Sequence, residues 1–91
     1  MRVDVFGKEE CAKCRTTKNK LNHFLKKWGL DGKVEIQYFD MDSEEGIAEG
    51  AFRDVGQIPT IIVEDGGKDL ARWEGVVPDS DEVKSALTGQ A

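Results

Sequence analysis

The fold is decided by one segment near the start of the chain, Val3-Asp4-Val5-Phe6-Gly7-Lys8-Glu9-Glu10-Cys11-Ala12-Lys13-Cys14. Its first residues form an apolar run that predicts a strand over residues 2–6. Its last residues open a helical pattern, so that Cys11 and Cys14 stand where the strand gives way to the helix. Two thiols with this spacing at the start of a helix can close on each other, which is typical of a reversible dithiol.

The pattern that follows predicts a helix from Ala12 to Trp28, which ends at Gly29. Its buried positions recur at intervals of three and four and therefore share one face; they are Cys14, Thr17, Leu21, Leu25 and Trp28. Unpaired backbone N–H groups and the helix dipole favour a thiolate at the start of such a helix. Cys11 is therefore the candidate nucleophile, and Cys14, one turn further and on the buried face, is the candidate resolving thiol.

Residues 34–39 alternate apolar with polar side chains and predict a second strand. Ser43 is expected to cap a short second helix, with its apolar residues toward the core; these are Ile47, Ala51 and Val55. Residues 60–63 predict a buried strand, which a tight turn at Asp65-Gly66-Gly67 connects to an antiparallel strand over residues 70–74.

A last helix follows Pro78, where Asp79 and Glu82 have the pattern of a capping box. The order of elements is β-α-β-α-β-β-α. Because a crossover between parallel strands is right-handed, this order predicts an α/β fold with a four-stranded mixed sheet and helices on both faces. A chain of 91 residues is expected to form a single domain over residues 1–91.

The composition is that of a soluble globular chain, with 38% hydrophobic and 34% charged residues. No apolar run approaches the roughly 20 residues that cross a bilayer. The N-terminus lacks the apolar core of a signal peptide, so we expect a cytoplasmic protein without membrane association. In that reducing compartment a CxxC pair is catalytic or metal-binding rather than a structural staple.

The net charge of −5 is distributed unevenly. Residues 11–30 carry basic side chains and no acid, whereas residues 31–54 carry eight acids and two bases. Because a nucleic-acid-binding protein is usually basic overall, we expect no nucleic-acid partner. The basic helix instead favours an acidic partner or a thiolate nearby.

Metal binding through the same two thiols is the second functional class. A closed zinc site needs four ligands, and the other candidate, His23, falls on the helix away from the cysteines. An iron–sulfur cluster that bridges two chains stays open as an alternative. A third alternative is a non-catalytic interaction domain. We expect no bound metal or cofactor.

The first segment resembles the glutaredoxins, in which a strand, a Gly and a short loop lead to CxxC. The later segment Val55-Gly56-Gln57-Ile58-Pro59-Thr60-Ile61-Ile62-Val63, continuing to Gly75, resembles the thioredoxins. The joint occurrence of CxxC and Ile58-Pro59-Thr60 about 45 residues later is a specific signal of the thioredoxin and glutaredoxin superfamily.

This resemblance implies the thioredoxin fold and a thiol–disulfide oxidoreductase, whose Cys11/Cys14 dithiol reduces protein disulfides and becomes the redox-active Cys11–Cys14 disulfide. It also implies a cis Ile58–Pro59 bond beside the dithiol, where the backbone of Ile58 binds an extended substrate peptide. The resemblance places Thr60 and Gly75 on the same substrate-binding surface. Lys13 is a candidate partner contact beside the reactive sulfur.

Departures from the two families bear on the electron donor. Ala12 and Lys13 stand between the cysteines, and Gly75 stands alone where glutaredoxins have the Gly-Gly and Asp that hold glutathione. We therefore expect a monomeric electron carrier fed by a thioredoxin-reductase-type flavoprotein, with glutathione as the alternative donor.

Thioredoxins also keep a buried acid behind the cysteines, which relays protons. Asp4 is offset from that position by one residue. Successive side chains of a strand point to opposite faces, so we expect Asp4 to face away from the dithiol.

Overall fold

The structure is a computed structural model that describes residues 1–89. Its elements are β1 (Arg2–Gly7), α1 (Ala12–Lys27), β2 (Glu35–Asp40), α2 (Glu44–Phe52), β3 (Thr60–Asp65), β4 (Lys68–Glu74) and α3 (Ser80–Thr88). The four strands form one sheet in the order β2-β1-β3-β4. Strand β1 is parallel to β2 and antiparallel to β3, and β3 is antiparallel to β4. The mixed sheet and the order of elements confirm the predicted fold.

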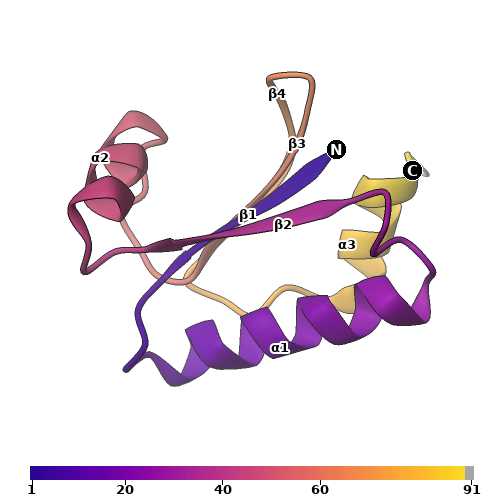
Figure 1. Cartoon of the computed structure of the whole chain (residues 1–91), viewed down its shortest axis with the longest axis horizontal. Helices are drawn as coiled ribbons and strands as arrows, with labels where there is room; N and C mark the ends of the chain where they lie inside the picture. The colour runs from indigo at the N-terminus through magenta and orange to yellow at the C-terminus, as the bar shows by residue number, and fades with distance from the viewer. Residues whose placement is uncertain (90–91) are drawn as a thin grey trace.

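Strand β1 lies inside the sheet, and its two faces serve different purposes. Val3 and Val5 pack into the hydrophobic core with residues of α1 and α3. On the opposite face, Phe6 stacks on Phe39 with ring centroids 4.7 Å apart. Figure 1 shows α1 running beneath the strands with α3 beside its end, while α2 lies across the sheet from them. The helices therefore cover both faces, as predicted.

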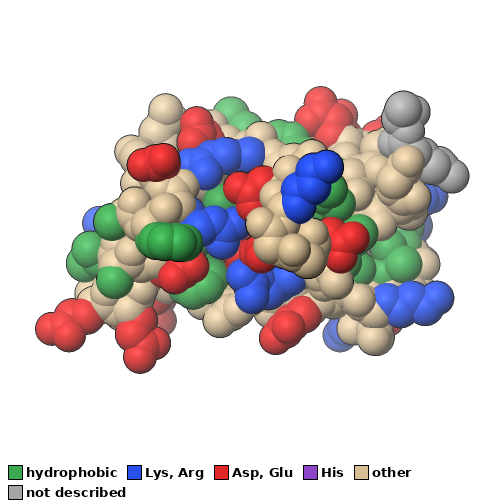
Figure 2. All heavy atoms as spheres, turned by 90° about the horizontal axis from the view of Figure 1, so that it is seen from above, with side chains coloured by type: hydrophobic (Ala, Val, Ile, Leu, Met, Phe, Trp, Pro, Cys, Tyr) green, Lys and Arg blue, Asp and Glu red, His purple; other side chains and the backbone are tan. Residues whose placement is uncertain are grey.

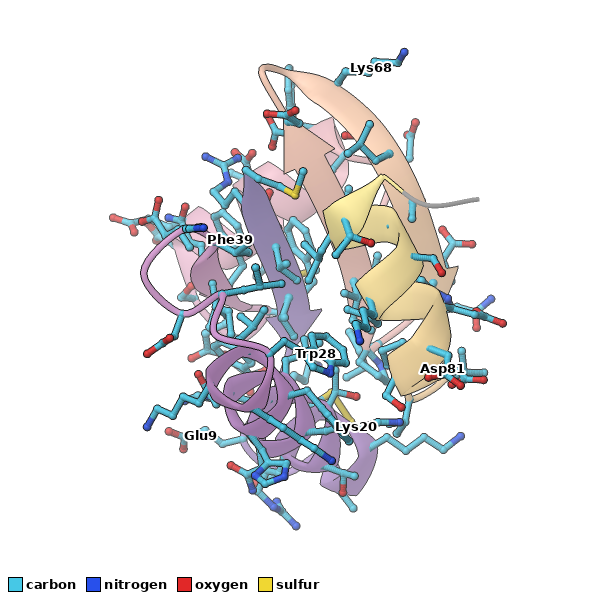
Figure 3. The ribbon with its side chains drawn as sticks, turned by 90° about the vertical axis from the view of Figure 1, so that its right-hand side faces the viewer. Glu9, Lys20, Trp28, Phe39, Lys68 and Asp81 are labelled. Atoms are coloured by element: carbon cyan, nitrogen blue, oxygen red, sulfur yellow. A yellow bond between two sulfur atoms is a disulfide. The ribbon has the colours of Figure 1, made fainter. Side chains whose placement is uncertain are left out.

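Helix α1 is the longest element and supplies much of this core. Cys14, Thr17, Leu21 and Leu25 are its buried residues, which confirms the predicted face. Trp28 packs against the core from the end of the helix, between α1 and α3 (Figure 3). The Lys20 ammonium donates to the carbonyl of Pro78 over 2.7 Å, so that α1 is also tied to the loop before α3.

Helix α2 begins at the predicted cap, where the Ser43 hydroxyl accepts a hydrogen bond from the Gly46 N–H over 3.0 Å. The prediction for its buried face is wrong: Ile47 is 54% exposed, Ala51 is exposed and Val55 is only half-buried. The residues that face the sheet are Gly46 and Gly50.

The reason is the close approach of α2 to the end of β2. A Cβ on Gly46 would overlap the carbonyl group of Asp40, and a Cβ on Gly50 would lie 2.7 Å from the terminal methyl of Met41. Only a face without side chains fits against the backbone at this distance. The apolar residues of the helix are consequently turned toward solvent.

The capping box predicted at α3 is only half formed. The Asp79 carboxylate caps the helix by accepting from the Asp81 N–H over 2.9 Å. Glu82 accepts instead from the indole N–H of Trp73 over 2.8 Å, so that it ties α3 to β4. The turn between β3 and β4 has Gly66 and Gly67 at positive φ, as its sequence predicts.

Charged side chains fill the part of the sheet face that α2 leaves open. Figure 2 looks down on this face and shows basic and acidic side chains interleaved across its middle. Asp4 is fully buried there, between Arg2 and Arg53. Within residues 1–89, no helix has the length and apolar character that crossing a membrane requires.

Candidate active site

Cys11 and Cys14 form a disulfide at the start of α1, with their Cα atoms 5.2 Å apart. Cys11 is the N-cap residue, and its sulfur accepts a hydrogen bond from the Cys14 N–H over 3.2 Å. A sulfur in this position lies at the positive end of the helix dipole, among the backbone N–H groups that stabilise a thiolate.

The two sulfurs differ in access to solvent. Cys11 is half-buried, whereas Cys14 has no exposed surface. A substrate can therefore approach Cys11 and not Cys14. An accessible Cys11 and a buried Cys14 are consistent with Cys11 as the candidate nucleophile and Cys14 as the candidate resolving thiol.

Gly7, the last residue of β1, makes room for the buried thiol. A Cβ built on Gly7 would lie 2.8 Å from the Sγ of Cys14 and 3.1 Å from the Oη of Tyr38. The 2.8 Å distance is shorter than a carbon atom allows, so Cys14 packs directly on the glycine backbone. Gly7 is the Gly of the strand-Gly-loop-CxxC segment, whereas no motif in the sequence includes Tyr38. The alternation of apolar and polar residues over 34–39 places Tyr38 on the inward-facing side of the strand, and this is the one sequence signal for its position.

The loop before β3 reaches the same edge of the sheet as the dithiol. Thr60 pairs with Phe6, so the residues before Thr60 lie next to the segment that leaves β1 for Cys11. The Ile58–Pro59 bond is cis, as the resemblance implies. Pro59 is buried and Ile58 is half-buried.

Two hydrogen bonds hold this loop in place. The Thr60 hydroxyl donates to the carbonyl of Gln57 over 2.6 Å, and the Gly75 N–H donates to the carbonyl of Pro59 over 2.7 Å. In the described part of the chain, the backbone N–H and C=O of Ile58 bond to no other backbone group. They remain available at the edge where the dithiol lies.

An open cleft joins the two loops. It has a volume of about 270 Å³ and is lined by Lys8, Met41, Val55, Gly56, Gln57 and Ile58. Lys8 belongs to the segment before Cys11, and Gln57 and Ile58 belong to the loop before β3. The cleft therefore lies between the segment that leads to Cys11 and the loop that holds the cis-proline.

The charges around Cys11 oppose one another. The Lys8 ammonium lies 3.5 Å from a carboxylate oxygen of Asp42, which offsets part of its charge. Glu9 and Glu10 are exposed. Lys13 is exposed in the first turn of α1 and is not paired with an acid within residues 1–89. Of Lys8 and Lys13, Lys13 is therefore the one whose charge no acid within residues 1–89 offsets.

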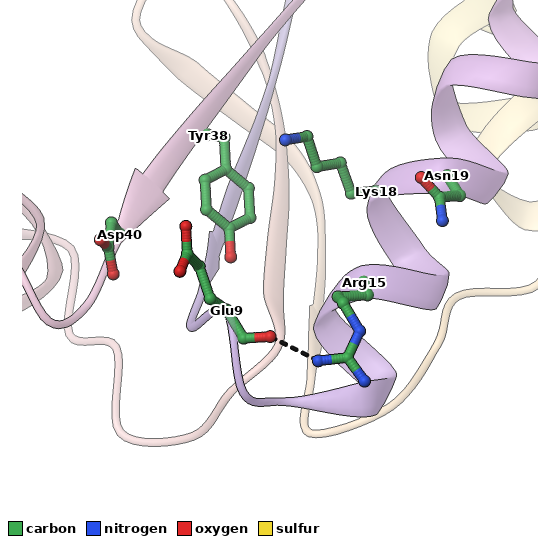
Figure 4. Close-up of a pocket in the computed structure, with 6 residues that line it drawn as sticks. All are labelled: Glu9, Arg15, Lys18, Asn19, Tyr38 and Asp40. Atoms are coloured by element: carbon green, nitrogen blue, oxygen red, sulfur yellow. Dashed lines mark hydrogen bonds between the residues drawn. The ribbon is translucent and has the colours of Figure 1, made fainter.

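A second, larger cleft lies on the other side of the dithiol segment. Its volume is about 510 Å³, and its lining is Glu9, Arg15, Lys18, Asn19, Tyr38 and Asp40 (Figure 4). The Arg15 guanidinium donates to the backbone carbonyl of Glu9, which fixes one wall. The Lys18 ammonium lies 5.0 Å from the centre of the Tyr38 ring.

Other candidate residues lie away from the site. His23 is exposed on α1. Asp4 is buried on the sheet face opposite the core that α1 covers, as predicted, and there it is paired with arginines. Within residues 1–89 no cluster of three or more His, Cys, Asp or Glu side chains could hold a metal ion.

Comparison with known proteins identifies the family. The sequence model described as "Thioredoxin domain" matches residues 1–88, and the chain therefore belongs to the thioredoxin family. A search of curated protein sequences gives no match. With its Cys11–Cys14 disulfide, membership of this family supports thiol–disulfide oxidoreductase activity.

Solved thioredoxin structures have the same fold. Thioredoxin 1 from Thermosipho africanus TCF52B superposes with a TM-score of 0.77 at 20% identity, over 98% of this chain and 92% of that one. Thioredoxin O2 from Arabidopsis thaliana in the oxidized state gives 0.76 at 23% identity, over 97% and 72%. Thioredoxin-2 of the malaria parasite gives 0.81 at 20% identity, over 97% and 81%.

Proposed function

We propose that the protein reduces disulfides of other proteins, with Cys11 as the nucleophile and Cys14 as the resolving thiol. The observation that carries this proposal is the pairing of an accessible Cys11 at the helix N-cap with a fully buried Cys14. The family to which the chain belongs supports the same chemistry.

In the reduced protein the Cys11 thiolate attacks one sulfur of the substrate disulfide. A bond forms between Cys11 and that sulfur, and the other substrate sulfur leaves as a thiolate that takes a proton from solvent. The Cys14 thiolate then attacks Cys11. The Cys11–Cys14 disulfide forms, and the second substrate sulfur leaves. Two electrons have passed to the substrate.

The substrate is held next to the disulfide by the loop before β3. An extended peptide that binds the backbone N–H and C=O of Ile58 would add to the loop as a short strand. The cleft lined by Lys8, Gln57 and Ile58 receives its side chains. Thr60 and Gly75 hold the loop, and Lys13 stands at the rim as a charged contact.

The regenerating reductant in this proposal is a thioredoxin-reductase-type flavoprotein, in a reducing cytoplasm, and the protein works as a monomer. The single Gly75 and the Ala12-Lys13 pair support a reductase rather than glutathione, because the residues that hold glutathione in glutaredoxins are replaced.

A coupled assay tests the proposal. One arm supplies NADPH and thioredoxin reductase, and the other supplies NADPH, glutathione reductase and glutathione, each with insulin as the disulfide substrate. We expect turnover in the reductase arm. Turnover in the glutathione arm alone would assign glutathione as the donor, and inactivity with reductases from several sources would contradict the proposed activity. Anaerobic purification checks the iron–sulfur alternative by colour and metal content.

The roles of the two thiols are separated by trapping. Cys14→Ser should accumulate a mixed disulfide between Cys11 and a protein substrate, because no resolving thiol remains. Cys11→Ser is the matched control and should trap nothing. The opposite pattern would reverse the two roles.

A further inference from the structure

Tyr38 lies beside the dithiol and has no part in the chemistry described above. It is the single tyrosine of the chain. It pairs with Val5 across the β1–β2 ladder, so that its side chain shares the face on which Val5 meets α1. The ring packs against the core, and the hydroxyl points into the larger cleft toward Glu9 (Figure 4).

The hydroxyl of Tyr38 and the sulfur of Cys14 converge on one point. The position of a Cβ on Gly7 is 2.8 Å from the Cys14 Sγ and 3.1 Å from the Tyr38 Oη, so both atoms border the same small space beside the Gly7 backbone. An O–H donor and a sulfur acceptor are therefore neighbours at this glycine. The hydroxyl also lines the cleft, whereas Cys14 is fully buried.

The buried position of Cys14 disfavours the thiolate that a resolving thiol needs. An apolar environment raises the pKa of a thiol, yet only the thiolate attacks a disulfide. A hydrogen bond to the charged form offsets this by lowering the pKa. Asp4 cannot provide that bond, because it lies on the opposite face of the sheet, where Arg2 and Arg53 bind it.

We infer that the Tyr38 hydroxyl donates a hydrogen bond to the Cys14 sulfur and stabilises its thiolate during resolution of the mixed disulfide. The inference rests on the proposed function for the step that it serves. In that step the Cys14–Cys11 bond forms, the bond between Cys11 and the substrate sulfur breaks, and the substrate thiolate takes its proton from solvent. Tyr38 keeps its proton throughout.

The surroundings of Tyr38 keep it a donor. Burial raises its pKa above the usual value, and the negative charges of Asp40, Glu9 and Asp42 raise it further. From α1, Lys18 lies over the ring and Arg15 lines the same cleft, so the site also holds positive charge. Each of these negative charges and the burial of the ring favour the protonated hydroxyl, which is the form that donates a hydrogen bond.

The pKa of Cys14 measures this hydrogen bond without any substrate. In the Cys11→Ser variant, Cys14 is the only thiol, and the NMR shift of its Cβ follows ionisation even though the group is buried. Adding Tyr38→Phe keeps the ring and removes the donor. We expect the Cys14 pKa to rise by about 1–2 units, the equivalent of one hydrogen bond to a charged group. An unchanged pKa would overturn the inference.

Lys18→Met in the same Cys11→Ser background is the matched control. It removes the cation over the ring and leaves the hydroxyl, so the Cys14 pKa should rise less than it does with Tyr38→Phe. An equal rise would assign the effect to the charge of the cleft and contradict a role for the hydroxyl. Urea unfolding of each variant verifies that the fold is intact. Failure of the disulfide-reduction assay would leave these pKa values as they are, so the two proposals fail separately.

Discussion

Arg53, at the end of α2, donates from Nη1 to a carboxylate oxygen of Asp4 over 2.9 Å. Asp4 has no exposed surface, and Arg2 binds its other oxygen at 2.7 Å. Both guanidinium groups have a raised pKa. For Arg2 the hydrogen bond with Asp4 is the main cause. For Arg53 burial is the largest effect and lowers the pKa, but the hydrogen bond with Asp4 and the negative charges of Asp69, Asp4 and Glu64 together outweigh it. The acid within β1 therefore anchors α2 to the sheet.

Removal of the Asp4 charge is expected to destabilise the fold. In Asp4→Asn, two arginines keep their charges without the carboxylate that balances them, and breaking a buried ion pair costs about 3 kcal/mol. The free energy of unfolding in urea measures this. Asp69→Asn is the control, because Asp69 also binds Arg53 but is largely exposed, and its loss should cost at most about 1 kcal/mol. If both variants lost the same free energy of unfolding, burial of Asp4 would not be what makes its ion pairs stabilising.

The two glycines of α2 offer a matched pair of substitutions. In an exposed helix, Gly→Ala stabilises by about 1 kcal/mol. At Gly46 the new methyl would meet the backbone of Asp40, which cannot move away, so we expect a net loss of about 1–3 kcal/mol. At Gly50 it would meet the flexible end of Met41, so Gly50→Ala should be close to neutral or stabilising. Thermal unfolding distinguishes the two, and a stabilising Gly46→Ala would contradict the close approach of α2 to β2.

These glycines also show where sequence patterns stop being informative. The apolar spacing in α1 predicts its buried face correctly, because a long helix on a sheet buries its large side chains. The same logic placed Ile47 and Ala51 in the core, and there it is wrong. The approach of α2 to Asp40 depends on the path of the chain after β2, and no local pattern records that path.

In the candidate active site, too, some residues can be predicted from sequence motifs and others cannot. Cys11, Cys14 and the Ile58–Pro59 segment are visible as motifs, since their chemistry depends on neighbours in sequence. The proximity of Tyr38 to Cys14 depends instead on the register that pairs Val5 with Tyr38 and on the missing side chain of Gly7. Alternation in residues 34–39 predicts that Tyr38 faces inward but not what it meets there.

The ionisation of Tyr38 can be followed directly, because no other tyrosine absorbs as tyrosinate. We expect its pKa to lie above the ~10 of a free tyrosine, and Asp40→Asn should lower it by removing a nearby negative charge. A raised pKa in the folded state gives stability below pH ~10 that is lost as the pH rises toward the folded value. Tyr38→Phe should not show this loss. A Tyr38 pKa at or below that of free tyrosine would contradict the burial of the ring.

Lys13 is expected to favour the Cys11 thiolate through its charge. In Lys13→Glu the pKa of Cys11 should rise, and alkylation of the reduced protein by iodoacetamide below that pKa should slow severalfold at low salt. Lys33→Glu is the control, since Lys33 is exposed and lies before β2, away from the disulfide. The same slowing in both variants would point to net charge rather than to the position of Lys13. High salt should reduce the effect.

The hydroxyl of Thr60 is expected to hold the substrate-binding loop. It donates to the carbonyl of Gln57 over 2.6 Å, and Thr60→Val removes that bond while keeping the shape of the side chain. Loss of a buried hydrogen bond costs about 1 kcal/mol, which urea unfolding would measure. If Ile58 binds the substrate backbone, a looser loop should raise KM for a protein disulfide more than it lowers kcat. Thr60→Ser keeps the hydroxyl and should retain the KM of the original protein. A change in kcat alone would place Thr60 in the chemistry of the dithiol instead of in the docking of its substrate.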